Sequence, residues 1–376
     1  MRRSLRVLAA ALISAVAATS LSLPTASAAA VTDRAVFNNP HVAGQQRAIV
    51  DHLRSLIRGA AAGSTINIAL YHFNDPTVVT DLVAARDRGV RVQMVLDHMS
   101  SDKPAGADLI AKLGTDRSKP SWVALCTKGR ACIGDLGTPI MHNKFFLFSD
   151  TSGAKNVVVQ GSANLTPTNA TKMWNNAVTL VGNTGLYNSY LNYFRDLVAQ
   201  RKNNDYYRSD ASGNAKTYFF PRAGRSEASD TIYNMLDDNV ACEGNTTVGT
   251  KTGRTIIRIA MWSFSRDDIA RKLRELATKK CWVEVVYTEL DAGSLDHLRG
   301  HDRIVLKQIP GDFVVHSKYL LIEGTYAGKK NSKWVVTGSH NYTNAALREN
   351  DEALLRLDSA AIHDQYRANF TAMRSS

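Results

Sequence analysis

The chain has 376 residues, of which 44% are hydrophobic and 8% aromatic, which excludes a disordered chain and leaves room for two domains or two lobes. It carries 46 basic and 34 acidic side chains, a net charge of +12. A basic balance favours anionic partners such as lipid headgroups, nucleic acid or phosphate esters. The charges are scattered along the chain, so they rank these partners only weakly.

The first predicted element is an export signal. Three arginines within the first six residues precede an apolar stretch over residues 7–18, and Ala26-Ser27-Ala28 supplies a small-residue cleavage site. The apolar stretch is shorter than the ~20 residues of a membrane-spanning helix, which favours a signal peptide over an anchor. We therefore expect a secreted protein, with a signal peptide over residues 1–28 that is cleaved near Ala28. Its loss takes the basic count from 46 to 43 and the net charge to +9.

A strand–helix–strand pattern then occurs twice in the chain. Ile68–Phe73 and Ile259–Phe264 are similar apolar strands, each followed by an amphipathic helix and by a second strand, over 91–97 and 282–288. Two strands joined by one helix imply parallel pairing. The sequence thus predicts two repeats, over residues 29–215 and 216–376.

The chain has four cysteines, at positions 126, 132, 242 and 281. An even count in an exported protein favours two disulfides, for which three connectivities are possible. Cys126 with Cys132 would close a short loop and leave Cys242 with Cys281. The spacing does not match a zinc site, and no cysteine lies in the context of a catalytic thiol.

Each half also carries a pair of short polar motifs. A His-x-Lys sequence is followed about 20 residues later by Gly-Ser-x-Asn, at the end of a short apolar strand. Residues two apart on a strand project from the same face, so the His and Lys of each half point together. The motif residues are His142, Lys144, Ser162 and Asn164 in the first half, and His316, Lys318, Ser339 and Asn341 in the second.

These residue types suit the cleavage of a phosphodiester. The lysines and the Gly-Ser-x-Asn segments supply hydrogen-bond donors to the non-bridging phosphate oxygens. One imidazole attacks phosphorus and the other protonates the leaving oxygen, roles that suit histidine because its unperturbed pKa of ~6.5 lies near neutral pH. The lysines bring the positive charge that a metal would otherwise supply, so we expect no metal and no cofactor.

The paired motifs resemble the signature of the phospholipase D superfamily, and the resemblance covers essentially the whole mature chain. It implies an α/β fold of two α/β/α sandwich repeats packed about a pseudo-two-fold axis, with both histidines at the interface. It also implies a phosphohistidine intermediate that is released by water, or by an alcohol in transphosphatidylation.

The first departure from the family pattern concerns a supporting carboxylate. The family usually has Asp five residues after the motif Lys, where this chain has Ser149, with Asp150 one step later, and Glu323 in the second half. We expect Asp150 and Glu323 to support the site.

The second departure is an acid on the strand after Gly-Ser-x-Asn. The second half has Glu352, and the stretch matched to it in the first half, Asn175-Asn176-Ala177, has Ala177 at that position. The resemblance implies that such an acid orients the histidine of the opposite repeat. We expect Glu352 to be catalytic and to fix His142 as the nucleophile, with His316 as the general acid. The alternative is a solvated carboxylate at the strand end.

The substrate has three interpretations. A phospholipid at a membrane surface fits secretion and the long loop before His142; nucleic acid fits the basic charge; a degenerate phosphate-binding protein would explain the departures. We favour phospholipid hydrolysis by a monomer with no stable protein partner, with a secreted nuclease as the alternative. Residues expected near the site, either as lining or as simple packing, are Tyr71, His72, Trp262, Ser263 and His340.

Overall fold

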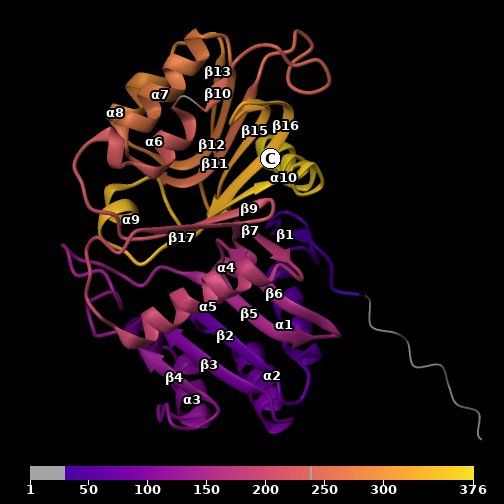
Figure 1. Ribbon diagram of the computed structural model, residues 1–376, viewed down its shortest axis with the longest axis vertical. Coiled ribbons are helices and arrows are strands. Elements are labelled where there is room, and N and C mark those ends of the chain that lie inside the picture. The colour runs from indigo at the N-terminus through magenta and orange to yellow at the C-terminus, as the bar shows by residue number, and fades with distance from the viewer. Residues whose placement is uncertain (1–29, 238) are drawn as a thin grey trace, which may run out of the picture.

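The computed structural model describes residues 30–237 and 239–376, and the expected signal peptide over residues 1–28 lies outside them. The chain is an α/β protein of two lobes, each built on its own sheet (Figure 1). Within the described ranges, no helix combines the length and the apolar character needed to cross a bilayer.

The first sheet has the strand order β1-β7-β6-β5-β2-β3-β4. β2 pairs in parallel with β3 and β3 with β4, whereas the other neighbours are antiparallel. The parallel β2–β3 pair is the predicted strand–helix–strand unit. The strands are β1 (Arg34–Asn38), β2 (Thr65–Leu70), β3 (Arg91–Leu96), β4 (Trp122–Leu125), β5 (Lys144–Thr151), β6 (Ala154–Gly161) and β7 (Met173–Leu180).

The second sheet repeats this order as β9-β17-β16-β15-β11-β12-β13, with β8 added beyond β9 and β10 paired to β15. Its β11–β12 and β12–β13 pairs are again parallel, and the rest of the order is antiparallel. The common topology confirms the two predicted repeats. The strands are β8 (Arg208–Ser212), β9 (Ala215–Phe219), β10 (Val240–Ala241), β11 (Ile256–Phe264), β12 (Trp282–Leu290), β13 (Ile304–Gln308), β15 (Lys318–Tyr326), β16 (Lys329–Gly338) and β17 (Ala353–Asp358).

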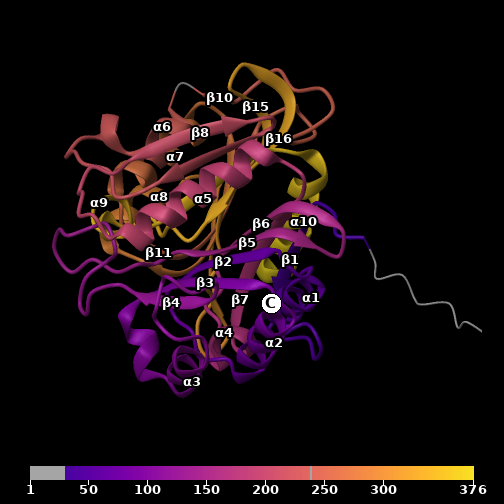
Figure 2. The same ribbon diagram turned by 60° about the horizontal axis from the view of Figure 1, so that its bottom comes forward.

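Helices cover both faces of each sheet, which gives the expected α/β/α sandwiches. Three apolar cores separate the layers: one under α1–α3, one under α6–α8, and a central core that α5 and α10 share with the inner faces of both sheets. In Figure 2, α5 lies between the strands of the two repeats. The α-helices are α1 (Ala48–Gly59), α2 (Pro76–Asp87), α3 (Pro104–Leu113), α4 (Pro167–Thr171), α5 (Thr184–Ala199), α6 (Thr231–Leu236), α7 (Asp267–Thr278), α8 (Ala292–Leu298), α9 (Asn344–Arg348) and α10 (Ala360–Arg374), and the 3-10 helices are η1 (His98–Asp102) and η2 (Glu227–Ser229).

The repeats are joined by reciprocal backbone pairing just before each His-x-Lys motif. β14 (Val314–Val315) of the second repeat pairs in parallel with β7 of the first. In the first repeat, Met141 forms a parallel bridge to Asp351, which directly precedes Glu352 and β17. Each motif is therefore held against the last strand of the other repeat. The boundary between residues 215 and 216 stays a prediction; both β8 and β9 lie on the second sheet.

The four cysteines form two disulfides, Cys126–Cys132 and Cys242–Cys281, and no cysteine is free among the described residues. This is the pairing in which the first bridge closes a short loop. The loop lies between β4 and β5, on the segment that leads into His142.

Candidate active site

The two His-x-Lys motifs lie at the beginning of equivalent strands. Lys144 begins β5 and Lys318 begins β15, each two residues after its histidine. Both ammonium groups are fully enclosed, and each donates a 2.6 Å hydrogen bond to the backbone carbonyl of the histidine in its own motif. The histidines keep a little exposure, at 6% of the residue for His142 and 8% for His316.

His142 is paired with a carboxylate of the other repeat. Its Nδ1 lies 2.8 Å from Oε1 of Glu352, which is fully buried just before β17. The hydroxyl of Ser339 donates to Oε2 of the same carboxylate. A carboxylate can only accept here, so Nδ1 of His142 carries the proton and Nε2 is left to react.

His316 has an equivalent partner, which corrects the sequence comparison. Its Nδ1 lies 2.9 Å from Oδ1 of Asn175, and the hydroxyl of Ser162 donates to the same oxygen at 2.9 Å. Asn175 and Glu352 each lie 13 residues after the serine of their own Gly-Ser-x-Asn motif. The match of Glu352 to Ala177 was therefore wrong by two residues, and counting from the serines would have found Asn175.

The amide of Asn175 is oriented by the protein rather than by the histidine alone. Its Nδ2 donates to the carbonyl of Asn169 at 3.1 Å, which leaves Oδ1 facing His316. Nδ1 of His316 is thus the donor, and its Nε2 faces the site. The two histidines share one geometry but differ in charge, since one has a carboxylate and the other a neutral amide.

The remaining motif residues divide into two groups. The buried side-chain oxygens of Asn164 and Asn341 have no hydrogen-bond partner among the described residues, and a phosphate oxygen would be bound by the amide nitrogens. The hydroxyls of Ser162 and Ser339 instead hold the partners of the opposite histidines. Phosphate binding by these four residues stays a prediction.

The expected supporting carboxylates lie at the far ends of their strands. Asp150 pairs with Lys155 at 2.5 Å, near the end of β5, and Glu323 pairs with Arg258 at 2.8 Å inside the second repeat. In place of a carboxylate, Ser149 accepts a 2.8 Å hydrogen bond from the backbone N–H of Thr65. These contacts tie strand ends together, and none of them reaches the histidines.

Aromatic rings flank the histidines in matching positions. The ring of Tyr71 meets that of His142 edge to face at 5.1 Å between centroids, and Trp262 meets His316 in the same way at 5.4 Å. His72 and Ser263 are half-buried beside them. His340 is fully buried against Phe220, and burial lowers its pKa to about 3, so it is a neutral packed ring.

The site is a desolvated cluster of basic groups. Burial lowers the pKa of Lys144 to about 7, and burial followed by the charge of Lys144 holds the pKa of Lys318 well below its usual range. Burial and then the two lysines hold the pKa values of His142 and His316 well below the ordinary value. Glu352 raises the pKa values of both lysines but does not outweigh burial, so a phosphate-sized anion in the site would add favourable negative charge.

Anion binding should weaken as the pH rises. A bound anion stabilises the charged form of Lys144, so the pKa of this group in the complex lies above its free value of about 7. Affinity for tungstate, a phosphate mimic, should be constant below that pH and fall by up to about tenfold per pH unit above it. Titration calorimetry on the mature protein measures this slope. An unchanged affinity above pH 7, or the same slope in Lys144→Met, would contradict the assignment.

The arrangement defines an enzyme of phosphodiesterase type, with one site shared by two repeats. A family model described as "Cardiolipin synthase, PLD-like domain" matches residues 53–198 and 251–374, that is, both repeats. The chain belongs to the phospholipase D superfamily. A comparison with curated proteins finds no significant match.

Solved structures share this fold at low sequence identity. Phosphatidylserine synthase from Haemophilus influenzae Rd KW20 has 12% identity and a TM-score of 0.61, over 90% of this chain and 85% of the synthase. Polyphosphate kinase from Porphyromonas gingivalis has 11% identity and a TM-score of 0.58, over 91% of this chain. The aligned region spans 50% of the kinase.

Proposed function

We propose that the protein is a secreted phospholipase D-type hydrolase that cleaves phospholipids through a phosphohistidine intermediate, without a metal. The observation that carries the proposal is the crossed pairing of His142 with Glu352 and of His316 with Asn175. It brings two imidazoles with free Nε2 atoms, two lysines and two available amides to one interface. The two disulfides suit the oxidising surroundings of an exported protein.

In the first step, Nε2 of His142 attacks phosphorus while the lysines and asparagines hold the non-bridging oxygens. The P–N bond forms, the P–O bond to the headgroup breaks, and Nε2 of His316 gives its proton to the leaving oxygen. In the second step, His316 takes a proton from water, the new P–O bond forms, and the P–N bond breaks. Both histidines return to their initial states.

The different partners suit these two roles. The phosphohistidine carries positive charge on its ring for the lifetime of the intermediate, and the carboxylate of Glu352 stabilises that charge. Asn175 adds no charge, so the imidazolium of His316 gives up its proton more readily. This supports His142 as the nucleophile and His316 as the general acid.

Two exposed apolar side chains, one on the loop before His142 and one beside a residue that contacts the segment before His316, favour a lipid substrate. Among the described residues, Leu136 and Val42 are the exposed large hydrophobic side chains, at 51% and 40%. Leu136 lies on the loop before His142. Val42 follows His41, whose ring contacts that of Phe313 at 4.7 Å, just before β14 and His316. Exposed apolar side chains near the site suit contact with a membrane.

The mature protein should release the headgroup from phosphatidylcholine vesicles, with the same rate in EDTA. His142→Ala should remove the activity, and plasmid DNA assayed in parallel should stay intact. Nicked DNA with untouched vesicles would make the protein a nuclease. Activity on neither substrate would favour a phosphate-binding protein without catalysis.

The exposed side chain of Leu136 can be tested separately in the same assay. Leu136→Asp should lower the rate on vesicles several-fold and leave the rate on p-nitrophenyl phosphocholine unchanged, because only the vesicle requires contact with the lipid surface. Equal rates on vesicles for the variant and the wild type would remove the support that Leu136 gives to a lipid substrate.

A further inference from the structure

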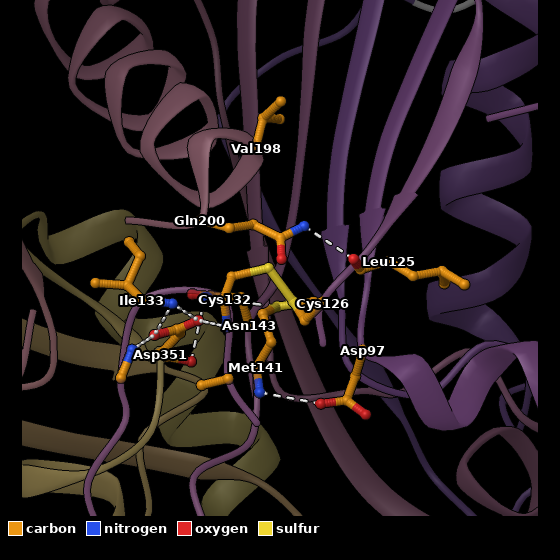
Figure 3. The surroundings of a disulfide bond; sticks show 12 residues. Asp97, Leu125, Cys126, Cys132, Ile133, Met141, Asn143, Val198, Gln200 and Asp351 are labelled. Carbon is orange, nitrogen blue, oxygen red and sulfur yellow. Dashed lines mark hydrogen bonds between the residues drawn. A yellow bond between two sulfur atoms is a disulfide. The ribbon is translucent and has the colours of Figure 1, made fainter. Parts of the chain in front are cut away.

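Asp351, next to Glu352, is held by the loop that the Cys126–Cys132 disulfide closes. Its buried carboxylate accepts hydrogen bonds from three consecutive backbone N–H groups at the end of this loop (Figure 3). The N–H of Cys132 lies 2.7 Å from Oδ2, that of Ile133 lies 3.0 Å from Oδ2, and that of Gly134 lies 2.8 Å from Oδ1. The first repeat thus provides a backbone cradle for an acid of the second.

The backbone of Asp351 is tied to the His142 segment at the same time. Its carbonyl accepts from the N–H of His142 at 3.0 Å and from Nδ2 of Asn143 at 3.1 Å. Its N–H donates to the carbonyl of Ile140 at 3.1 Å. One residue therefore connects the disulfide loop, the segment before β5 that carries His142, and Glu352.

His316 has no equivalent of the Asp351 cradle. Trp174 precedes Asn175 as Asp351 precedes Glu352, and its carbonyl accepts from the N–H of His316 at 2.9 Å. The backbone contact is the same in both repeats. The side chain of Trp174 is instead packed in the central apolar core. The cradle is therefore confined to the histidine whose partner is charged.

The disulfide loop packs closely against residues 349–351 at Gly134. A Cβ atom added there would lie 1.9 Å from the backbone carbonyl oxygen of Glu349, so any larger residue would push the loop away from residues 349–351. Nearby, Nζ of Lys202 donates to the carbonyl of Ala131 at 2.6 Å, which holds the loop from the other side. The cradle is thus fixed by a disulfide, a close glycine contact and a lysine hydrogen bond.

We propose that Asp351 is a positioning residue, and that the disulfide loop acts through it to hold Glu352 at hydrogen-bond distance from His142. The inference rests on the proposed function, because it assigns the loop to the nucleophile of that reaction. A carboxylate bound by three N–H groups resists displacement. Displacement of a reacting group by ~1 Å costs about a hundredfold in rate.

The test compares three variants of the mature protein with one control. Asp351→Asn turns one acceptor into a donor facing N–H groups, Gly134→Ala displaces the loop, and Cys126→Ser with Cys132→Ser opens it. On p-nitrophenyl phosphocholine, each should lower kcat about tenfold to a hundredfold and leave KM within about twofold. Cys242→Ser with Cys281→Ser removes the other disulfide and should keep kcat near the wild-type value. Thermal unfolding of each variant is followed by circular dichroism, and the rates are compared at temperatures at which every variant is folded.

A second readout does not depend on turnover. In 15N-histidine-labelled protein, the Nδ1 proton of His142 should give a downfield resonance that is lost or exchange-broadened in Asp351→Asn and kept in the control. Wild-type kcat in folded Asp351→Asn, or equal losses in the control, would overturn the inference. An inactive wild type would overturn the proposed function instead, and the resonance would still decide whether Asp351 positions His142.

Discussion

His142→Ala should abolish the cleavage of every phosphodiester, whereas His316→Ala should spare substrates with an activated leaving group. Without the nucleophile no P–N bond forms, and we expect a loss of at least about 10⁴-fold. The general acid is needed only where the leaving alkoxide is strongly basic, and its removal there costs about 10²- to 10⁴-fold. A p-nitrophenolate leaves without protonation, so its first release by His316→Ala should stay close to the wild-type rate.

Rapid-mixing measurements of p-nitrophenol release from p-nitrophenyl phosphocholine separate this first step from turnover. His316→Ala should show a burst followed by slow turnover, because the same histidine activates water in the second step. A burst in His142→Ala, with none in His316→Ala, would reverse the two roles. Loss of the burst in both variants would contradict the assignment of nucleophile and general acid from the hydrogen-bond partners of the two histidines.

Glu352→Gln should reduce kcat by about 10²- to 10⁴-fold, as when the acid that orients a catalytic histidine is replaced by its amide. The amide no longer stabilises the ring as a cation, so the pKa of His142, already low from burial and the nearby lysines, falls further. The nucleophile must be neutral to react. The acidic limb of the kcat/KM profile should therefore move to lower pH.

Asn175→Asp is the matched reciprocal change, since it gives His316 the carboxylate that His142 already has. A carboxylate favours the imidazolium, so the pKa of His316 should rise. The general acid must be protonated to react, and the basic limb of the profile should move to higher pH. If Glu352→Gln and Asn175→Asp shift the same limb of the kcat/KM profile, the assignment of His142 as nucleophile and His316 as general acid is contradicted.

The interface makes folding and catalysis depend on the same contacts. His142 takes its partner from the second repeat and His316 from the first, and Asn176 of β7 also reaches Thr337 of β16 at 2.7 Å. Neither repeat holds a complete site. A change that separates the repeats would remove both histidine pairs together, even if each sandwich kept its own outer core.

The sequence by itself determined the repeats and the motif residues. Strand patterns and polar motifs can be recognised from short stretches of sequence. Because each of them occurs twice in the same order, a chance similarity between the two halves is an inadequate explanation. The structure places Lys144 and Lys318 at equivalent strand beginnings, but His142 and His316 lie just before the strands, whereas the His-x-Lys pattern predicted them on the strands. The short spacing of Cys126 and Cys132 likewise suggested the disulfide pairing that is found.

Only the tertiary structure decided which side chains meet across the interface. Asn175 contacts His316 over 141 residues of chain, and Asp351 contacts the disulfide loop over more than 200. Such pairs depend on how the last strand of one repeat is registered against the motif of the other. Residues two apart on a strand share a face, so the alternation of side chains does not distinguish Asn175 from Ala177. The local pattern therefore pointed to Ala177, whereas the packed interface presents Asn175 to His316.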